Sequence, residues 1–156
     1  MDLGIKGRRA IVCASSKGLG RACAMSLAAE GVHVTLTARG AEVLAKTAAE
    51  IRKASPGVTV TEVVGDITTP AGREAALKAC PDPDILINNA GIAVEKLAVD
   101  QTEADWDAVI NANLKGAYFA ATEMARRMIA RRPLIPRSTV SLPFVQMIFC
   151  SPIRPV

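Results

Sequence analysis

Aromatic side chains are scarce in this sequence, at 3% of its 156 residues, and histidine occurs once. The net charge is +4, but it lies at one end of the chain. Residues 126–156 carry six arginines and no acidic residue, whereas residues 1–125 carry 13 basic and 15 acidic residues. A slightly acidic body with so few aromatic rings argues against a dedicated nucleic-acid-binding protein.

Cysteine pairs are also missing. The four cysteines lack the close spacing that binds zinc or forms a redox disulfide, so we expect buried free thiols and no metal site. They are Cys13, Cys23, Cys80 and Cys150.

Long apolar runs are absent as well. The most apolar stretch, residues 140–150, is broken by Pro143 and Gln146 and is too short to span a bilayer. The basic pair Arg8-Arg9 follows the N-terminus with no apolar, signal-like segment before it. Because 50% of the residues are hydrophobic, the chain can bury a core. We expect one globular cytoplasmic protein that binds neither membranes nor nucleic acids.

The sequence does contain an alternation of short β-branched segments with longer helical ones, which is typical of a parallel α/β sheet. Stretches rich in Val, Ile and Thr predict strands at residues 9–14, 32–38, 58–64 and 84–88. Helical periodicity predicts helices at residues 19–30, 41–54, 70–79 and 103–130. We assign Trp106, Met124 and Met128 to packing in the core or at an interface, and His33 to the core.

The turn after the first predicted strand is rich in small residues. Backbone N–H groups at a helix start can approach a pyrophosphate there, and the helix N-terminus adds partial positive charge. Alone, such a turn is as often tight packing as a nucleotide site. The residues of this candidate cofactor-binding turn are Ala14, Ser15, Ser16, Lys17, Gly18, Leu19 and Gly20.

A cation at the end of the second predicted strand points to a phosphorylated dinucleotide. Sites for NAD place an acid there to accept from the ribose hydroxyls, whereas a 2′-phosphate needs a positive charge. This sequence has Arg39 at that place, and Lys17 in the glycine turn can reach the same phosphate. The alternative is that both are solvated surface charges. We therefore predict NADP(H) in preference to NAD.

These motifs resemble those of the short-chain dehydrogenase/reductase family. The family's glycine motif, Thr-Gly-x-x-x-Gly-x-Gly, aligns with residues 13–20, where the last two glycines match and Cys13-Ala14 replaces the first pair. Its Asn-Asn-Ala-Gly motif is present unchanged as Asn88, Asn89, Ala90 and Gly91. The resemblance covers about residues 5–130. It implies a Rossmann-like, doubly wound parallel sheet, truncated after the fourth strand and the helix that follows.

The resemblance also assigns roles at two further places. Asp66 and Ile67, after the third strand, resemble the family's adenine-contacting acid and its neighbour. Asp66 could instead cap the next helix, a role open equally to Thr68 and Thr69. Asn113 occupies the position of the family's catalytic asparagine. Because asparagine is unfavourable inside a helix, this position favours a functional or kinked-backbone reason over that of an exposed polar residue.

Two features leave alternatives open. Asn88 and Asn89 can contact a cofactor, or they can tie neighbouring loops together through side chain to backbone hydrogen bonds. Ala14, in place of the family's first glycine, is strained if the turn needs a positive φ and costs little if φ is negative.

The family's catalytic Tyr-x-x-x-Lys pair does not occur in these 156 residues. The one tyrosine, Tyr118, is followed four positions later by Thr122, and the last lysine is Lys115. In the family the tyrosine protonates the substrate carbonyl and the lysine lowers its pKa. A complete catalytic set is therefore missing from this sequence.

The residues after the last predicted helix have a different composition. We divide the chain into an incomplete NAD(P)-binding domain at residues 1–130 and a Pro/Arg-rich tail at residues 131–156. The tail has no glycine and no acidic residue, and it holds five of the nine prolines. This shift predicts either an out-of-frame end or a divergent extension.

Three functions remain open from the sequence. The resemblance implies an NADP(H)-dependent oxidoreductase for small carbonyl or alcohol substrates, 3-oxoacyl compounds among them. The alternatives are a catalytically incomplete NADP(H)-binding fragment or regulatory module, and a product that neither binds nor folds. In the family's strand order, 3-2-1-4, the fourth strand would have an unpaired edge. The helix at 103–130 resembles the family's dimerisation helix, so we expect association.

Overall fold

A four-stranded parallel sheet forms the centre of the computed structural model, which describes residues 3–131. The strand order is β3-β2-β1-β4, so the predicted parallel α/β sheet and its order are confirmed. Within the described residues β4 is an edge strand that pairs with β1 alone. The strands are β1 (Arg9–Val12), β2 (His33–Ala38), β3 (Val60–Val64) and β4 (Ile85–Ile87).

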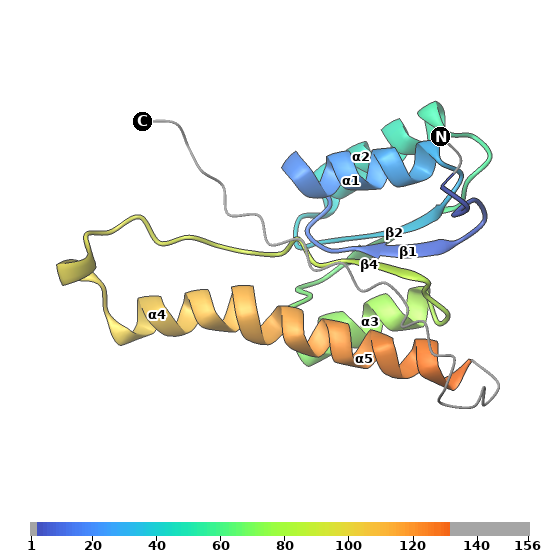
Figure 1. Ribbon diagram of the computed structural model, residues 1–156. Coiled ribbons are helices and arrows are strands. Elements are labelled where there is room, and N and C mark those ends of the chain that lie inside the picture. Colours follow the sequence, from blue (N-terminus) through green and yellow to red (C-terminus); the bar gives the residue numbers. More distant parts are fainter. Residues whose placement is uncertain (1–2, 132–156) are drawn as a thin grey trace.

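Helices cover both faces of this sheet (Figure 1). α1 (Gly18–Ala29) and α2 (Ala41–Ala54) lie on one face, and α3 (Pro70–Ala79) lies with α5 (Ala117–Ala130) on the other. A long segment outside the sheet links β4 to α5. It contains η1 (Ala98–Asp100), α4 (Glu103–Ile110) and the π-helical η2 (Asn111–Gly116).

Alternating side chains of the central strand β1 divide the core into two halves, because successive residues of a strand point to opposite faces. Ala10 and Val12 pack with apolar residues of α1 and α2. Ile11 and Cys13 pack with residues of α3 and α5 instead. Each fully buried Leu or Ile in such a core stabilises the fold by about 1.5–3 kcal/mol relative to exposure.

Two of the four packing assignments are confirmed, His33 is not a core residue, and Trp106 is outside the core of this chain, so that its assignment to an interface stays a prediction. Met124 and Met128 are buried between α5 and the sheet, as predicted. Trp106 is 63% exposed, because helix α4, which carries it, contributes no buried residue to the core. His33 is only half-buried at the start of β2, where its Nδ1 accepts a hydrogen bond from the N–H of Thr59 at 2.9 Å.

The predicted continuous helix at 103–130 is interrupted by the π turn η2. A π turn widens the helix locally and is uncommon outside functional sites. Asn113 lies inside this turn, where the backbone departs from α-helical geometry. Helix α4 itself starts with a capping box formed by Thr102 and Asp105, which satisfies the first N–H groups of the helix.

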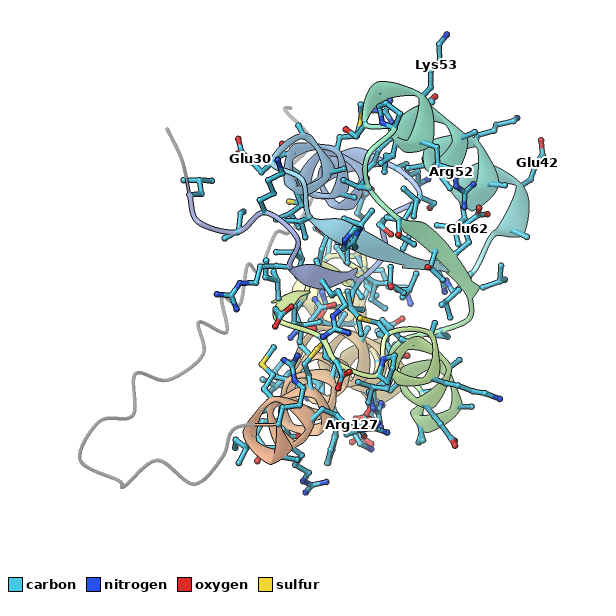
Figure 2. The ribbon with its side chains drawn as sticks, turned by 90° about the vertical axis from the view of Figure 1, so that its right-hand side faces the viewer. Glu30, Glu42, Arg52, Lys53, Glu62 and Arg127 are labelled. Atoms are coloured by element: carbon cyan, nitrogen blue, oxygen red, sulfur yellow. The ribbon has the colours of Figure 1, made fainter. Side chains whose placement is uncertain are left out.

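Charged side chains occupy the outside of the sheet-and-helix layers (Figure 2). Lys53 and Glu42 on α2 point away from the molecule. Arg52 on the same helix reaches β3, where it pairs with Glu62 at 2.9 Å. No helix within residues 3–131 is long and apolar enough to cross a membrane.

Residues 132–156 lie outside the described part of the chain. The Pro/Arg-rich tail at 131–156, and the domain boundary before it, therefore stay predictions.

Candidate dinucleotide site

A cleft of about 600 Å³ opens where the strands end and the chain turns into the next element. Its walls come from the segments that follow each of the four strands, together with α4 and the π turn. In open parallel sheets this edge is where ligands bind, because the turns at the carboxyl ends of the strands converge there. The predicted cofactor residues in its walls are Ala14, Ser16, Lys17, Arg39, Asp66, Ile67, Ala90 and Gly91.

The glycine turn contributes an open helix start. No side chain caps α1, whose N-cap is Lys17, and its first turn carries no acidic residue. Uncapped N–H groups and the helix dipole make such a start a place where a phosphate can bind. Gly20 lies so close to the carbonyl of Ala14 and to Nδ2 of Asn89 that a Cβ would collide with both. The turn therefore requires a glycine at position 20.

The backbone of Ala14 has a positive φ, which decides between the two alternatives that the sequence left open for this position. Its φ is +50°, and it is the one non-glycine residue with positive φ among residues 3–131. A Cβ is strained in this left-handed region. The family's first glycine is thus replaced here by a residue that holds a glycine conformation at some cost.

Ser15 and Ser16 are both anchored to other parts of the fold. Ser15 is fully buried: its N–H donates to the carbonyl of Thr37 at 2.9 Å, and its Oγ accepts from the N–H of Thr37 at 3.0 Å. The hydroxyl of Thr47 on α2 donates to the carbonyl of Ser16 at 2.8 Å. These bonds tie the glycine turn to β2 and α2. Of the two serines only Ser16 lines the cleft.

Two cations and one acid line the cleft. Lys17 and Arg39 are exposed, and Asp66 is half-buried. The hydrogen bond from the Thr68 hydroxyl holds the pKa of Asp66 below its usual value, and the charge of Arg39 acts in the same direction against the effect of burial. Asp66 is therefore a carboxylate at neutral pH, ready to accept a hydrogen bond.

Neither Asp66 nor Thr68 caps helix α3. Thr69 is the N-cap, and its hydroxyl accepts from the N–H of Gly72 at 3.1 Å. Both Thr68 donors go to Oδ1 of Asp66 instead, the N–H at 2.9 Å and the hydroxyl at 2.7 Å. Asp66 itself lines the cleft. Of the three capping alternatives left open by the sequence, only Thr69 is used.

Asn88 and Asn89 tie loops together, as one of the two readings of the sequence proposed. Nδ2 of Asn88 donates to the carbonyl of Ala117 at 3.1 Å, which fixes the start of α5. Nδ2 of Asn89 donates to the carbonyls of Cys13 and Ala14, both at 3.2 Å. Neither side chain is part of the cleft wall, whereas the following Ala90 and Gly91 are.

Asn113 reaches the same loop from the π turn. Its Oδ1 accepts from the N–H of Ile92 at 2.8 Å, and its Nδ2 donates to the carbonyl of Ile92 at 2.9 Å. A Cβ placed on Gly91 would come within 3.3 Å of the same Oδ1. The wall of the cleft at Ile92 is thus held by a side chain 21 positions further along the chain.

The three cysteines in the described part of the chain, Cys13, Cys23 and Cys80, do not line the cleft. Burial raises the pKa of the Cys13 thiol to about 12 and also raises the pKa of Cys80. Both are buried free thiols as predicted, Cys23 is half-buried, and Cys150 lies outside the described residues. Within residues 3–131 no group of three or more His, Cys, Asp or Glu side chains could hold a metal ion.

The family model for short chain dehydrogenases matches residues 8–133. The chain belongs to the short chain dehydrogenase family. Members of this family bind NAD or NADP and act with it on a small-molecule substrate. The family and the Rossmann-like fold predicted from the sequence are confirmed.

Curated short chain dehydrogenases match most of this chain. L-xylulose reductase of Mesocricetus auratus is 35% identical over 131 residues, which cover 84% of this chain and 51% of that protein. The 3-oxoacyl-[acyl-carrier-protein] reductase FabG of Staphylococcus aureus (strain Mu50) is 31% identical over 129 residues, which cover 80% and 52%. The chain thus spans about half the length of the curated relatives it matches.

Solved structures of the family superpose closely. L-sorbose reductase from Gluconobacter frateurii, complexed with NADPH and L-sorbose, gives a TM-score of 0.79 at 32% identity, over 84% of this chain and 51% of that one. A short chain dehydrogenase from Burkholderia cenocepacia in complex with NADP gives 0.72 at 34% identity, over 78% and 51%.

The residues of this short chain dehydrogenase fit a dinucleotide. The uncapped N-terminus of α1 can bind the phosphates of the dinucleotide. Because Gly20 has no Cβ, the Ala14 carbonyl and the Asn89 side chain can lie directly against it, which keeps the glycine turn tight. Sequence reasoning missed the supports of the site, namely Thr47 under Ser16 and Gly116 against Thr68. Buried or half-buried Thr and Gly on helices are weak sequence signals, because only the fold brings them to the loop.

Proposed function

We propose that this chain binds NADP(H) in the cleft at the strand ends. The α1 start and the glycine turn hold the phosphates, and Lys17 and Arg39 hold the additional phosphate on the adenosine ribose. Asp66 and Ile67 receive the adenine, and the Ala90 and Gly91 loop forms the far wall. What carries this proposal is the pair of exposed cations in the cleft wall, with Arg39 directly after β2, where an NAD site has an acid.

Two observations support the preference for NADP. Lys17 and Arg39 are positively charged, and within residues 3–131 neither is already paired with an acidic side chain. Among the described ion pairs, neither Lys17 nor Arg39 takes part in one. Arginine recognises a phosphate through two parallel N–H donors, so Arg39 is the stronger of the two candidate ligands. Two structural relatives are complexes with NADPH or NADP, which agrees with this preference.

We further propose that the chain is the dinucleotide-binding part of an oxidoreductase. NADPH supplies a hydride for a carbonyl, and NADP accepts one from an alcohol. Relatives named as reductases of L-xylulose, L-sorbose and 3-oxoacyl-[acyl-carrier-protein] make a small carbonyl compound the first substrate class to test. Asn113 contributes by holding the Ile92 backbone beside the cleft.

A second candidate is NADP(H) binding without turnover. Tyr118 is the one tyrosine of the sequence, and it is 58% exposed on α5, where its ring packs edge-on against Phe119. It is not among the residues that line the cleft. Within residues 3–131, a tyrosine that could protonate a carbonyl is therefore absent from these walls, which favours a binding fragment or regulatory module.

The test is titration of the 156-residue chain with NADPH and with NADH, for the unchanged chain and for Arg39→Ala. A charged hydrogen bond of about 1.5–3 kcal/mol corresponds to a loss of roughly tenfold to a hundredfold in NADPH affinity. NADH affinity is expected to change little, because NADH lacks the phosphate. Lys53→Ala, which removes an outward-pointing charge from α2, is the matched control.

Equal loss of NADPH and NADH binding in Arg39→Ala would contradict a 2′-phosphate role for this residue. Consumption of NADPH in the presence of L-xylulose or a 3-oxoacyl thioester separates the two candidates. Binding with turnover supports the oxidoreductase, and binding without turnover supports the non-catalytic fragment.

A further inference from the structure

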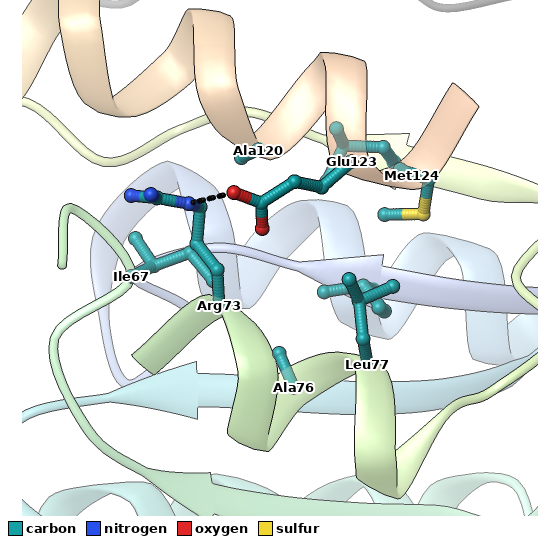
Figure 3. A pocket seen from close by; sticks show the side chains of 9 residues that line it. Ile67, Arg73, Ala76, Leu77, Ala120, Glu123 and Met124 are labelled. Atoms are coloured by element: carbon teal, nitrogen blue, oxygen red, sulfur yellow. Dashed lines mark hydrogen bonds and ion pairs between the residues drawn. The ribbon is translucent and has the colours of Figure 1, made fainter. Parts of the chain in front are cut away.

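Arg73 on α3 is a charged side chain that is only 7% exposed. A buried charge is costly unless it is paired and hydrogen-bonded. Its Nε donates to Oε1 of Glu123 on α5 at 3.0 Å, and its Nη1 donates to the carbonyl of Thr68 at 2.9 Å. Its guanidinium also lies 5.5 Å from the centroid of the Phe119 ring. Figure 3 shows the pair bridging the two helices beside a small cavity.

The carbonyl that Arg73 holds belongs to a residue of the cleft wall. Thr68 lines the cleft, and its N–H and hydroxyl both bind Oδ1 of Asp66. Glu123, Arg73, Thr68 and Asp66 are therefore joined by consecutive hydrogen bonds. These contacts run from Glu123 on α5, which does not line the cleft, to Asp66, which does.

Thr68 is also confined from the opposite side. A Cβ on Gly116, the last residue of the π turn, would meet Cβ of Thr68 at 3.1 Å and its Cα at 3.2 Å. Gly116 thus allows the π turn to lie directly against the loop that contains Thr68. On the other side, Arg73 on α3 donates a hydrogen bond to the Thr68 carbonyl. Together the two contacts fix where Thr68 sits, and hence where its two donors hold Asp66.

We propose that Arg73, oriented by Glu123, is a positioning residue that places Asp66 for the adenine side of the dinucleotide. This inference rests on the proposed NADP(H) function of the cleft. Arg73 does not line the cleft, so it acts through Thr68 and not by contact with the cofactor. The planar fork of arginine is essential to the role, because one side chain must serve a carboxylate and a carbonyl in fixed directions.

A purely structural pair would look similar in the fold but would behave differently on substitution. Arg52 provides the comparison within the same chain. Its Nη2 donates to the carbonyl of Val60 at 2.7 Å and pairs with Glu62 at 2.9 Å, so it too joins a carboxylate and a strand carbonyl. Neither Arg52 nor Glu62 lines the cleft, and Figure 2 shows both labelled on the α2 and β3 side.

The decisive variant is Arg73→Lys, with Arg52→Lys as its matched control. Lysine keeps the positive charge for Glu123 but loses the fork that holds Thr68. A second variant, Arg73→Met with Glu123→Leu, replaces the whole pair by apolar side chains of similar size, which buried pairs often tolerate without loss of stability. The melting temperature of each variant reports whether the fold is kept.

Two readouts are made on each folded variant. The first is the affinity for NADPH and for ADP, which shares the adenosine and the diphosphate but lacks the 2′-phosphate and the nicotinamide half. The second is the pKa of the Asp66 carboxyl, followed by carbon NMR in the absence of any nucleotide. We expect Arg73→Lys to weaken NADPH and ADP binding several-fold alike and to raise the pKa of Asp66 toward its usual value, while Arg52→Lys changes neither.

Unchanged nucleotide affinity and unchanged Asp66 titration in a folded Arg73→Lys chain would overturn the inference. A lower melting temperature with both readouts intact would do the same, because it would leave only a packing role. If the unchanged chain does not bind NADPH, the proposed function fails, yet the Asp66 titration still decides whether Arg73 positions this acid.

Discussion

Asn113 and Ile92 exchange two hydrogen bonds, with the side-chain amide of Asn113 pairing the N–H and the carbonyl of Ile92 at 2.8 and 2.9 Å. The side-chain amide thus satisfies one backbone donor and one backbone acceptor of Ile92, as a neighbouring strand would. Within residues 3–131 no strand pairs with this segment after β4. Both polar groups of Asn113 are used in this pairing, so its role in this structure is to hold the loop at Gly91. The π turn brings the side chain to that loop.

Asn113→Ala is expected to lower the free energy of unfolding by about 0.5–1.5 kcal/mol, because two solvent-accessible backbone groups of Ile92 exchange their side-chain partner for water. Urea unfolding measures the loss. Lys115→Ala, an exposed change in the same π turn, is the control and should leave stability nearly unchanged. Equal stability of both variants would contradict the bracing role of Asn113.

Ala14→Gly is expected to stabilise the chain slightly. The φ of +50° costs an alanine about 1–2 kcal/mol, and the greater freedom of glycine in the unfolded chain offsets about 0.5–1 kcal/mol of the gain. A net increase of up to about 1 kcal/mol in the free energy of unfolding follows. A clear decrease on chemical denaturation would show that the Ala14 methyl makes a stabilising contact that outweighs the strain.

Gly20→Ala is expected to distort the glycine turn. The added methyl would collide with the Ala14 carbonyl and come within 2.6 Å of Nδ2 of Asn89, so the backbone must move. We expect NADPH affinity to fall at least tenfold, roughly 1.4 kcal/mol, while the fold survives. Gly57→Ala, where nothing lies within 4 Å, is the control. Tight NADPH binding by Gly20→Ala would show that the phosphates bind elsewhere.

The capping box of α4 should persist in acid. Hydrogen bonds from Lys96 and Thr102 lower the pKa of Asp105 to about 2. Because the folded pKa is depressed, the contribution of this carboxylate to stability is present above the usual value of 3.8 and is lost as the pH falls through about 2. Carbon NMR of the Asp105 carboxyl checks the midpoint. Lys96→Ala should raise it, and a midpoint near 3.8 in the unchanged chain would contradict the arrangement.

The strands and the first three helices could be read from the sequence because their signals are local. Helices α2 and α3 begin and end where periodicity placed them, and Pro70 marks the first turn of α3. The predicted strands were one or two residues too long: β1 ends at Val12 before Cys13 and Ala14, and β3 starts at Val60 after the β-branched Val58 and Thr59. The sheet order followed from the resemblance to the family.

Long-range contacts account for what the sequence did not predict. The π turn depends on the pairing of Asn113 with Ile92 and on the contact of Gly116 with Thr68, neither of which has a sequence signature. Trp106 matched a helical repeat but belongs to a helix with no buried residue. The cofactor-binding residues remain a proposal, although the fold gathers eight of the fourteen that were predicted into the wall of one cleft.

The most direct test of the account is titration of the isotope-labelled chain with NADPH, followed by amide NMR. We predict saturable shifts concentrated at Gly18, Gly20, Arg39 and Asp66, the residues of the α1 start and the adenine side, with little change at Cys80 on the far side of the sheet. Absence of saturable shifts in a folded chain, or shifts that avoid these residues, would contradict the claim that this cleft binds NADP(H).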